Sequence, residues 1–247
     1  MTGVTRAGEH PAPTAAPFAV SAGVTLLAFD RPHTRRLQEE IFSELVYEVG
    51  DLGPSPMIVD CGAHVGFATA WFIGRHPGCQ ILAFEPEPDA LALLRGNAAS
   101  QGWAGARIVG AAAATAAGNV AFYVDPDRPA HPRASLLPER MSGHRIDVPA
   151  VRLADELPGH GAIDLLKMDV EGAEAALLED LARAGQLSRV RNIAAEFHHN
   201  LRGAGRLSHT LQLLEDAGFR YTLRARRHGD CASFQNVMVY AGRTGPA

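Results

Sequence analysis

Short apolar runs alternate with amphipathic segments over most of the chain, and this alternation predicts the order of its strands and helices. The apolar runs predict strands over 57–59, 80–84, 106–109, 120–124, 146–151, 163–168, 193–197, 221–223 and 237–240. Apolar positions at helical spacing predict helices that begin near Gly66 and extend over 88–99, 173–184 and 207–217. Because buried apolar strands that alternate with helices are typical of parallel sheets covered on both faces, we expect a doubly wound α/β fold. The polar stretch 224–235 predicts an antiparallel hairpin at the C-terminal end.

The N-terminal part of the chain has a different pattern. Residues 1–17 hold three prolines and many small residues without periodicity, which predicts a mobile tail. Apolar residues at helical spacing before Gly50 predict an amphipathic helix over 34–49. We therefore expect a disordered tail (1–17), an extension that carries this helix (18–53) and one main domain (54–243). The helix could cover a site or pair two subunits in a homodimer.

Composition and charge exclude several classes of protein. Hydrophobic residues make up 47% of the 247 residues and charged residues 20%, which is the balance of a globular protein. The 23 basic and 27 acidic residues give a net charge of −4, so nucleic acid is not an expected partner. The chain has no apolar stretch of membrane-spanning length and three widely spaced cysteines, which favours a soluble protein of the reducing cytoplasm.

Glycines follow the first strand of the main domain, and an acidic residue follows the second. Gly62 and Gly66 lie in a turn that opens a helix, where backbone can approach a ligand closely. Glu85 ends the next strand, at the position where a carboxylate accepts the hydroxyls of a ribose. Asp60, at the tip of the first strand, would repel a pyrophosphate and attract an ammonium group. The two carboxylates therefore favour S-adenosylmethionine over NAD, the alternative being that the glycines only allow tight packing and that Glu85 is a solvated strand end.

Further polar residues end two later strands of the predicted sheet, where a catalytic base is expected. Lys167, Asp169 and Glu171 lie at the tip of one strand, and Asp169 is the first candidate for a catalytic or cofactor-proximal carboxylate. Lys167 either keeps Asp169 ionised, acts as a base of lowered pKa, or forms an ion pair that only orders the turn. Glu196 and His198 share one side of the next strand, and His198 is a candidate general base or a surface histidine.

Two other interpretations concern this end of the sheet. The side chains of Asp169, Glu196 and His198 together could bind a divalent metal, although no tight ligand motif supports such a site. The proline-rich stretch 125–138 predicts a loop over the site, in which His131 and Ser135 are candidate substrate contacts. The alternative is an ordinary exposed connection.

Three blocks of the sequence resemble the FkbM family of S-adenosylmethionine-dependent methyltransferases. They are IVDCGAHVG from Ile58, AFEPEP from Ala83 and IDLLKMDVEGAE from Ile163, and the last is the most specific. The resemblance extends from about Leu37 to Tyr240 and implies the Rossmann-like, seven-stranded fold of class I methyltransferases. It implies a cofactor site formed by Asp60, Gly62, Ala63, His64, Gly66, Glu85, Pro86, Asn97, Gly110, Ala111, Ala112 and Asp169. His64 departs from the asparagine usual in the family.

The resemblance also implies an activity. Members of the family commonly methylate hydroxyl groups of secondary metabolites and glycans, so we expect O-methylation of a small hydroxylated metabolite or sugar. Methylation at nitrogen or carbon, another reaction on the same fold, and cofactor binding without turnover are the alternatives, because a fold does not determine its acceptor.

Overall fold

The computed structural model describes residues 15–21, 23–29, 32–131, 133–138, 144–225 and 235–243. Most of the predicted tail over 1–17, Cys231 and the greater part of the polar stretch 224–235 lie outside the described residues. Among the helices that are described, none is long and apolar enough to cross a membrane.

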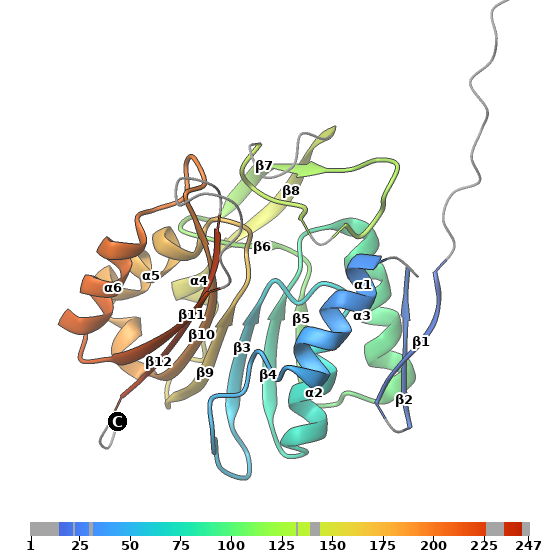
Figure 1. Ribbon diagram of the computed structural model, residues 1–247, viewed down its shortest axis with the longest axis horizontal. Helices are drawn as coiled ribbons and strands as arrows, with labels where there is room; N and C mark the ends of the chain where they lie inside the picture. Colours follow the sequence, from blue (N-terminus) through green and yellow to red (C-terminus); the bar gives the residue numbers. More distant parts are fainter. Residues whose placement is uncertain are drawn as a thin grey trace, which may run out of the picture.

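A mostly parallel sheet of seven strands forms the centre of the molecule, in the order β11-β12-β10-β9-β3-β4-β5 (Figure 1). Strand β12 is antiparallel to both of its neighbours, whereas the pairs from β10 to β5 are parallel. The strands are β3 (Met57–Cys61), β4 (Gln80–Phe84), β5 (Ala106–Val109), β9 (Ile163–Met168), β10 (Val190–His199), β11 (Arg220–Ala225) and β12 (Gln235–Gly242). The predicted doubly wound sheet and its antiparallel C-terminal hairpin are confirmed.

Helices cover both faces of this sheet, because successive side chains of each strand point to opposite faces. In β3, Ile58 packs with one core cluster and Val59 with the other. One face carries α2 (Phe67–Arg75) and α3 (Pro88–Gln101), and the other carries α4 (Leu153–Glu156), α5 (Glu174–Arg183) and α6 (Leu207–Asp216). A short 3₁₀ turn, η2 (Gln186–Arg189), leads from α5 into β10.

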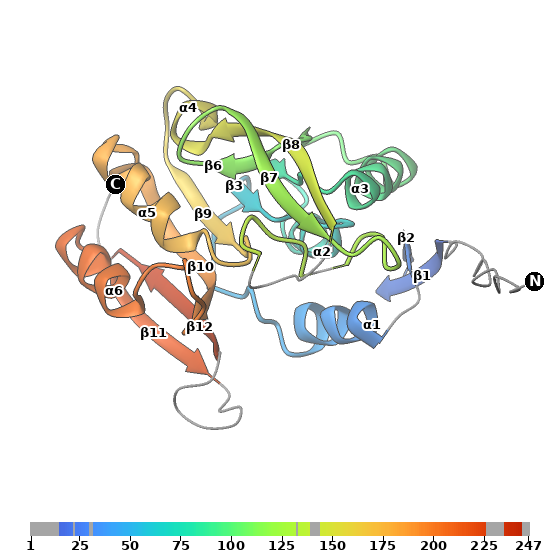
Figure 2. The ribbon, with the colours of Figure 1, turned by 90° about the horizontal axis from the view of Figure 1, so that it is seen from above.

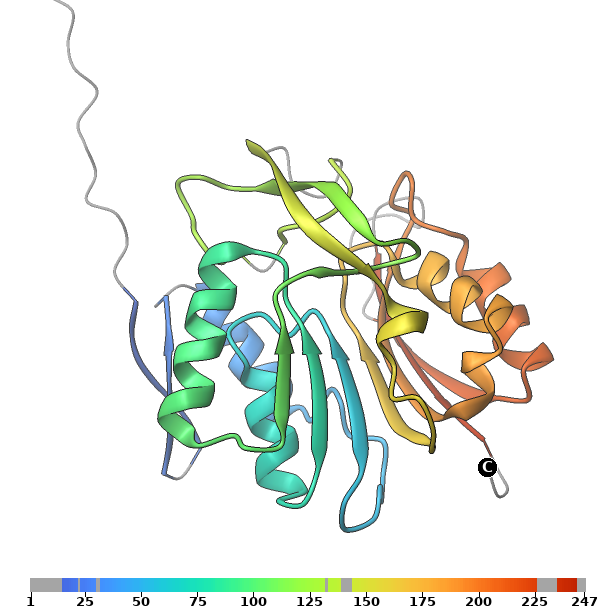
Figure 3. The ribbon, with the colours of Figure 1, turned by 180° about the vertical axis from the view of Figure 1, so that it is seen from behind.

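A second, smaller sheet lies across the carboxyl ends of the central strands (Figures 2 and 3). It consists of β6 (Ala112–Ala114), β8 (His144–Arg152) and β7 (Gly118–Val124), with β8 in the middle. The sequence predicted strands over 120–124 and 146–151, but it did not show that they pair with each other outside the central sheet. Their position places residues 125–131 and 133–138 above the end of the sheet where ligands bind in such folds.

The N-terminal extension differs from the prediction. A hairpin of β1 (Ala16–Ser21) and β2 (Val24–Ala28), which was not predicted, precedes the helix α1 (Pro32–Gln38). The helix continues as one wider turn, η1 (Glu39–Ser43), and then ends, so the predicted helix over 34–49 was wrong beyond Ser43. Leu45 has a left-handed backbone (φ 53), which breaks the helix and lets both Ile41 and Tyr47 become buried.

Candidate active site

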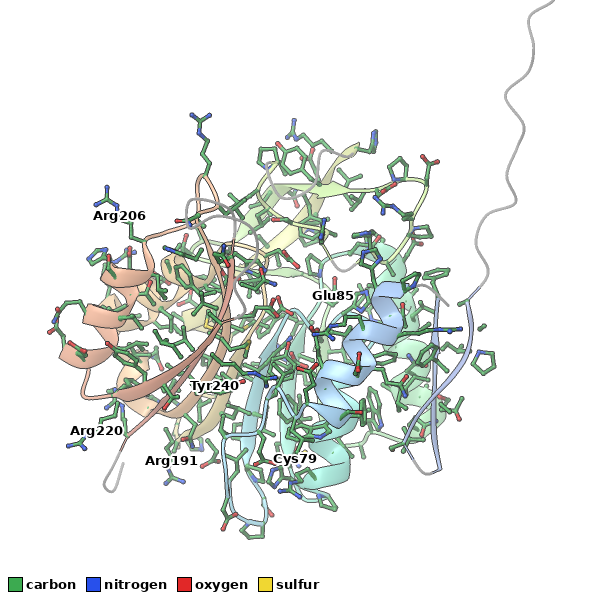
Figure 4. All side chains as sticks on the ribbon, in the orientation of Figure 1. Cys79, Glu85, Arg191, Arg206, Arg220 and Tyr240 are labelled. Carbon is green, nitrogen blue, oxygen red and sulfur yellow. The ribbon has the colours of Figure 1, made fainter. Side chains whose placement is uncertain are left out.

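A crevice lies at the carboxyl ends of β3, β4 and β9, which is the end of the sheet where ligands bind in folds of this kind. Figure 4 shows Glu85 at this end of the central sheet and Cys79 at the opposite end. The wall combines apolar side chains with a few polar ones. The lining residues are Leu37, Ile41, Tyr47, Gly62, Ala63, His64, Phe67, Ala68, Phe84, Glu85, Pro86, Glu87, Ala112, Ala113, Phe122, His131, Ala134, Leu136, Lys167, Asp169, Val170 and Glu171.

The turn after β3 requires glycine at position 62. Gly62 has a φ of 84°, and a Cβ built on it would overlap the backbone oxygen of Asp169. The tips of β3 and β9 also meet through a hydrogen bond of 3.0 Å from the Asp169 N–H to the Cys61 carbonyl. This contact is possible only without a side chain at Gly62, so the turn and Asp169 form one wall of the crevice.

Glu85 is held at the tip of β4 by two backbone donors. Its Oε2 accepts a hydrogen bond from the His64 N–H at 2.7 Å, and its Oε1 accepts one from the Glu87 N–H at 2.8 Å. Burial raises the pKa of Glu85 to about 7, and the two backbone donors oppose this shift. Each carboxylate oxygen has a second lone pair, so Glu85 can still accept hydrogen bonds from a ligand in the crevice.

Asp60 has a different role from the one expected. Its side chain is fully buried and is not part of the crevice wall. Its Oδ2 accepts a hydrogen bond of 2.9 Å from Thr69, and its Oδ1 lies 3.0 Å from Nζ of Lys167, the residue paired with it across β3 and β9. Asp60 therefore lies behind the crevice and positions Lys167 instead of meeting a ligand.

Lys167 is a buried cation that stabilises the glycine turn. Its Nζ donates to the Gly62 carbonyl at 2.6 Å and to the Cys61 carbonyl at 3.3 Å. Burial alone would lower the pKa of Lys167, but attraction to Asp60 and Asp169 outweighs it and raises the pKa. Of the three interpretations from the sequence, a base of lowered pKa is wrong and an ion pair that orders the turn fits the geometry.

Asp169 faces the crevice and is contacted by the N-terminal extension. Its Oδ2 accepts a hydrogen bond of 3.3 Å from the Tyr47 hydroxyl, and burial together with Asp169 raises the pKa of Tyr47. The Lys167 ammonium lies 5.3 Å from the centre of the same ring. The other oxygen of Asp169, Oδ1, is buried and has no hydrogen-bond partner among the described residues. A buried acceptor of this kind is expected to bind a ligand or an ion.

His64 offers a second acceptor in the crevice. Its Nε2 lies 2.8 Å from the Ala130 carbonyl, which can only accept, so Nε2 carries the proton. Burial lowers the pKa of His64, and the neutral ring leaves Nδ1 as an acceptor that has no partner in the described part of the chain. The left-handed backbone at His64 (φ 52) keeps its N–H on Glu85. An imidazole can therefore replace the amide usual at this position in the family.

His198 lies at the end of β10 between two carboxylates and is fully buried. Its Nδ1 is 2.8 Å from Oε1 of Glu174, and its Nε2 is 3.1 Å from Oε2 of Glu171. Burial alone would lower the pKa of His198, but the two carboxylates raise it well above the ordinary value. The two carboxylates therefore favour the protonated form of the imidazole, which does not suit the predicted role of general base.

Glu196 is separated from the crevice. It faces a second pocket between η1 and β12, where it accepts a hydrogen bond from Asn236, and burial raises its pKa to about 8. In the part of the chain that the structure describes, the potential metal ligands whose atoms lie within 4.8 Å of one another are Asp169, Glu171 and His198. The set expected from the sequence therefore changes, because Glu171 takes the place of Glu196.

Several other expected site residues do not line the crevice. The Asn97 side chain binds Leu27 of the N-terminal hairpin and the Val65 carbonyl, and Gly66 packs against Leu94 and Trp103. Ser135 is buried and donates a hydrogen bond of 2.8 Å to the Glu171 carbonyl, so it supports that turn and does not face a substrate. Gly110 and Ala111 come just before Ala112 in the chain and do not line the crevice. The expected residues that do line it include Ala63, His64, Pro86, Ala112 and His131.

The sequence did not single out every polar residue near the crevice, and Tyr47, Glu87 and Glu174 are examples. Tyr47 was assigned to an amphipathic helix, and no local signal placed its hydroxyl on Asp169. Glu174 belongs to the block that starts at Ile163, in which a carboxylate at a helix start predicts a contact to free backbone N–H groups. It accepts such contacts from Val170 and Gly172, in addition to holding His198.

The fold and the crevice together define the class of protein. A seven-stranded sheet with one reversed strand, and a glycine turn and a buried carboxylate at its central strand tips, is the arrangement of class I methyltransferases. The FkbM methyltransferase domain matches residues 60–221. The chain therefore belongs to the FkbM methyltransferase family.

Individual relatives agree with this assignment. The methyltransferase sdnD of Sordaria araneosa is 29% identical, over 87% of this chain and 92% of that protein. The 31-O-demethyl-FK506 methyltransferase FkbM of Streptomyces tacrolimicus is 30% identical, over 80% of this chain and 86% of that protein. The structure of M. jannaschii TYW2 in complex with AdoMet is similar in fold, with a TM-score of 0.52 and 11% identity over 94% of this chain and 87% of that chain.

Proposed function

We propose that the protein transfers the methyl group of S-adenosylmethionine to a hydroxyl group of a small molecule. The observation that carries the proposal is the buried Glu85 carboxylate, which faces the crevice while two backbone N–H groups keep it in place. A carboxylate so fixed is suited to accept the two hydroxyls of an adenosine ribose.

The charges around the crevice favour a cationic cofactor. Four carboxylates line it, those of Glu85, Glu87, Asp169 and Glu171, and the ammonium of Lys167 is already paired with Asp60. In a partly buried site this arrangement repels a pyrophosphate and attracts a sulfonium and an ammonium. We assign the ammonium of the cofactor to the neighbourhood of His64 Nδ1, a buried acceptor beside the glycine turn.

The acceptor class is proposed from the relatives and from the chemistry. The relative from Streptomyces tacrolimicus is described as acting on an oxygen of FK506, a small molecule. In the reaction a lone pair of the acceptor oxygen forms the new O–C bond, the C–S bond breaks, and its electron pair stays on sulfur to give a neutral thioether. The hydroxyl proton leaves to a base or to water. The protein contributes mainly by holding the oxygen and the sulfonium in line.

An assay with S-adenosylmethionine labelled with ¹³C in the methyl group tests this proposal. We expect incorporation into hydroxylated metabolites from an extract of the producing cells, with the carbon chemical shift of a methyl ether. Glu85→Ala should abolish incorporation, whereas Glu179→Ala, which changes a partly exposed carboxylate that contacts His209 and does not line the crevice, should not. Label on nitrogen or carbon would contradict O-methylation, and cofactor binding without transfer to any acceptor would contradict an enzyme.

A further inference from the structure

We propose that Asp169, Glu171 and His198 bind one divalent metal ion of the Mg²⁺ and Mn²⁺ class at the edge of the crevice. These three residues come from the end of β9, the turn that follows it and the end of β10, and one ligand atom of each lies within 4.8 Å of the others. Carboxylate oxygens suit Mg²⁺ and Mn²⁺, and one imidazole is compatible with Mn²⁺.

The spacing of the ligand atoms fits an octahedral ion. Two ligands at about 2.1 Å from such an ion are about 3.0 Å apart when adjacent and about 4.2 Å apart when opposite. Oε2 of Glu171 and Nε2 of His198 are 3.1 Å apart, as adjacent ligands would be. The third ligand atom, from Asp169, lies within the same 4.8 Å limit. Only small side-chain shifts are therefore needed to bring all three onto one ion.

Glu174 orients the histidine in the manner of known metal sites. Metal-binding histidines commonly donate their second ring N–H to a carboxylate, which fixes the ring and its tautomer. Oε1 of Glu174 lies 2.8 Å from Nδ1 of His198 and also accepts from the Val170 and Gly172 N–H groups. Because Glu174 and His198 are both fully buried, Nε2 is held toward Glu171. A metal ion would take the place of the proton that this nitrogen shares with Glu171.

A second observation, independent of the contact between His198 and Glu171, concerns Asp169. Its Oδ2 accepts from Tyr47, whereas its buried Oδ1 has no hydrogen-bond partner among the described residues. Both Asp169 and Glu171 line the crevice, so further coordination positions would open into it. If the proposed function holds, an acceptor hydroxyl bound to the ion at such a position would have a lower pKa and lose its proton more readily. The metal ion would then do what a general base with a pKa near neutral does in other enzymes.

Binding of Mn²⁺ to the full chain, followed by electron paramagnetic resonance and calorimetry without any cofactor, tests the site directly. We expect one ion per chain, displaced by Mg²⁺, and an affinity about tenfold or more lower in Glu174→Gln. Glu171→Gln and His198→Gln should weaken binding at least as much. The matched control is the surface pair His209 and Glu179, whose side chains are 3.5 Å apart, so His209→Gln and Glu179→Gln should bind Mn²⁺ like the wild type.

Further measurements separate this proposal from its alternatives. The thermal unfolding of each variant without metal shows whether it folds, and binding of S-adenosylmethionine to the same samples tests the cofactor site separately. Glu85→Ala should lose the cofactor and keep Mn²⁺, whereas His198→Gln, which changes a residue outside the crevice lining, should lose Mn²⁺ and keep the cofactor. The metal proposal is overturned if Mn²⁺ binds only above millimolar concentration. It is also overturned if the variants at the proposed site fold and bind Mn²⁺ as tightly as the control variants do. If, in addition, Asp169→Asn weakens the binding of S-adenosylmethionine, Oδ1 of Asp169 binds the ammonium group of the cofactor and not a metal ion.

Discussion

At the scale of single residues, the proposed contact of Glu85 with a ribose depends on whether the Glu85 carboxyl is ionised. A carboxylate whose pKa is raised by burial to about 7 is largely neutral at pH 6 and largely ionised at pH 8. Only the ionised form accepts hydrogen bonds on both oxygens, each of which already has one backbone donor. The affinity for an adenosine ligand should therefore depend on pH in the neutral range.

We predict that the affinity for S-adenosylmethionine increases about tenfold between pH 6 and pH 8, because the fraction of ionised Glu85 increases by that factor. Glu85→Gln keeps the size of the side chain but does not titrate, so it should bind more weakly and with little dependence on pH. Calorimetry at five pH values measures both curves. An equal increase in the wild type and in Glu85→Gln would assign the titration to another group.

The sequence predicted the positions of some site residues correctly, but the role that it predicted for Asp60 differs from the one in the structure. Gly62 and Glu85 follow from local rules, since a turn without Cβ and an acidic strand tip need no knowledge of distant residues. Asp60 was expected to meet a ligand, but the register of β3 and β9 pairs it with Lys167, whose charge it neutralises. The roles of such residues depend on which strands are neighbours and toward which face each side chain points.

At the scale of elements, α3 connects the N-terminal hairpin to the glycine turn between β3 and α2. Asn97 of α3 is fully buried, accepts a hydrogen bond of 2.6 Å from the Leu27 N–H, and donates to the carbonyls of Leu27 and Val65. Val65 belongs to the turn between β3 and α2. Asn97 therefore connects three elements without entering the crevice.

We predict that Asn97→Ala lowers the free energy of unfolding by about 2 to 3 kcal/mol, because it leaves buried backbone groups without partners. Gln101→Ala is the control from the same helix, since Gln101 makes one exposed hydrogen bond to the Thr25 carbonyl. Its effect should stay within about 0.5 kcal/mol. Urea unfolding of the three proteins measures the difference, and a loss in Asn97→Ala no larger than in Gln101→Ala would show that the connection contributes little.

Most elements from β3 onward could be predicted because their apolar periodicity is strong, but the short β6 and α4 were not. In the N-terminal part, the hairpin was not predicted and the helix was predicted to continue beyond Ser43. The wider turn η1 and the left-handed Leu45 change which side chains are buried after residue 43, and they depend on packing against the sheet. Tyr240 of β12 (labelled in Figure 4), for example, donates a hydrogen bond of 2.9 Å to the Val46 carbonyl. Such contacts between distant segments leave no periodic signal in the sequence.

At the scale of the whole molecule, the crevice is formed by parts that are far apart in the chain. The tips of the central strands form its floor, Leu37, Ile41 and Tyr47 of the N-terminal extension form one wall, and the small sheet contributes Phe122. The doubly wound sheet was predictable from the alternation of strands and helices, because few topologies satisfy it. The small sheet that covers the carboxyl ends was not, since strand patterns do not identify their partners.

Calorimetric titration of the wild-type chain with S-adenosylmethionine and, separately, with NAD is the most direct test of the central claim, that the carboxylate-lined crevice binds a cationic adenosine cofactor. We predict saturable binding of S-adenosylmethionine at one site per chain, loss of this binding in Glu85→Ala, and no measurable binding of NAD. Binding of NAD that equals or exceeds that of S-adenosylmethionine, or unchanged binding in Glu85→Ala, would contradict the account.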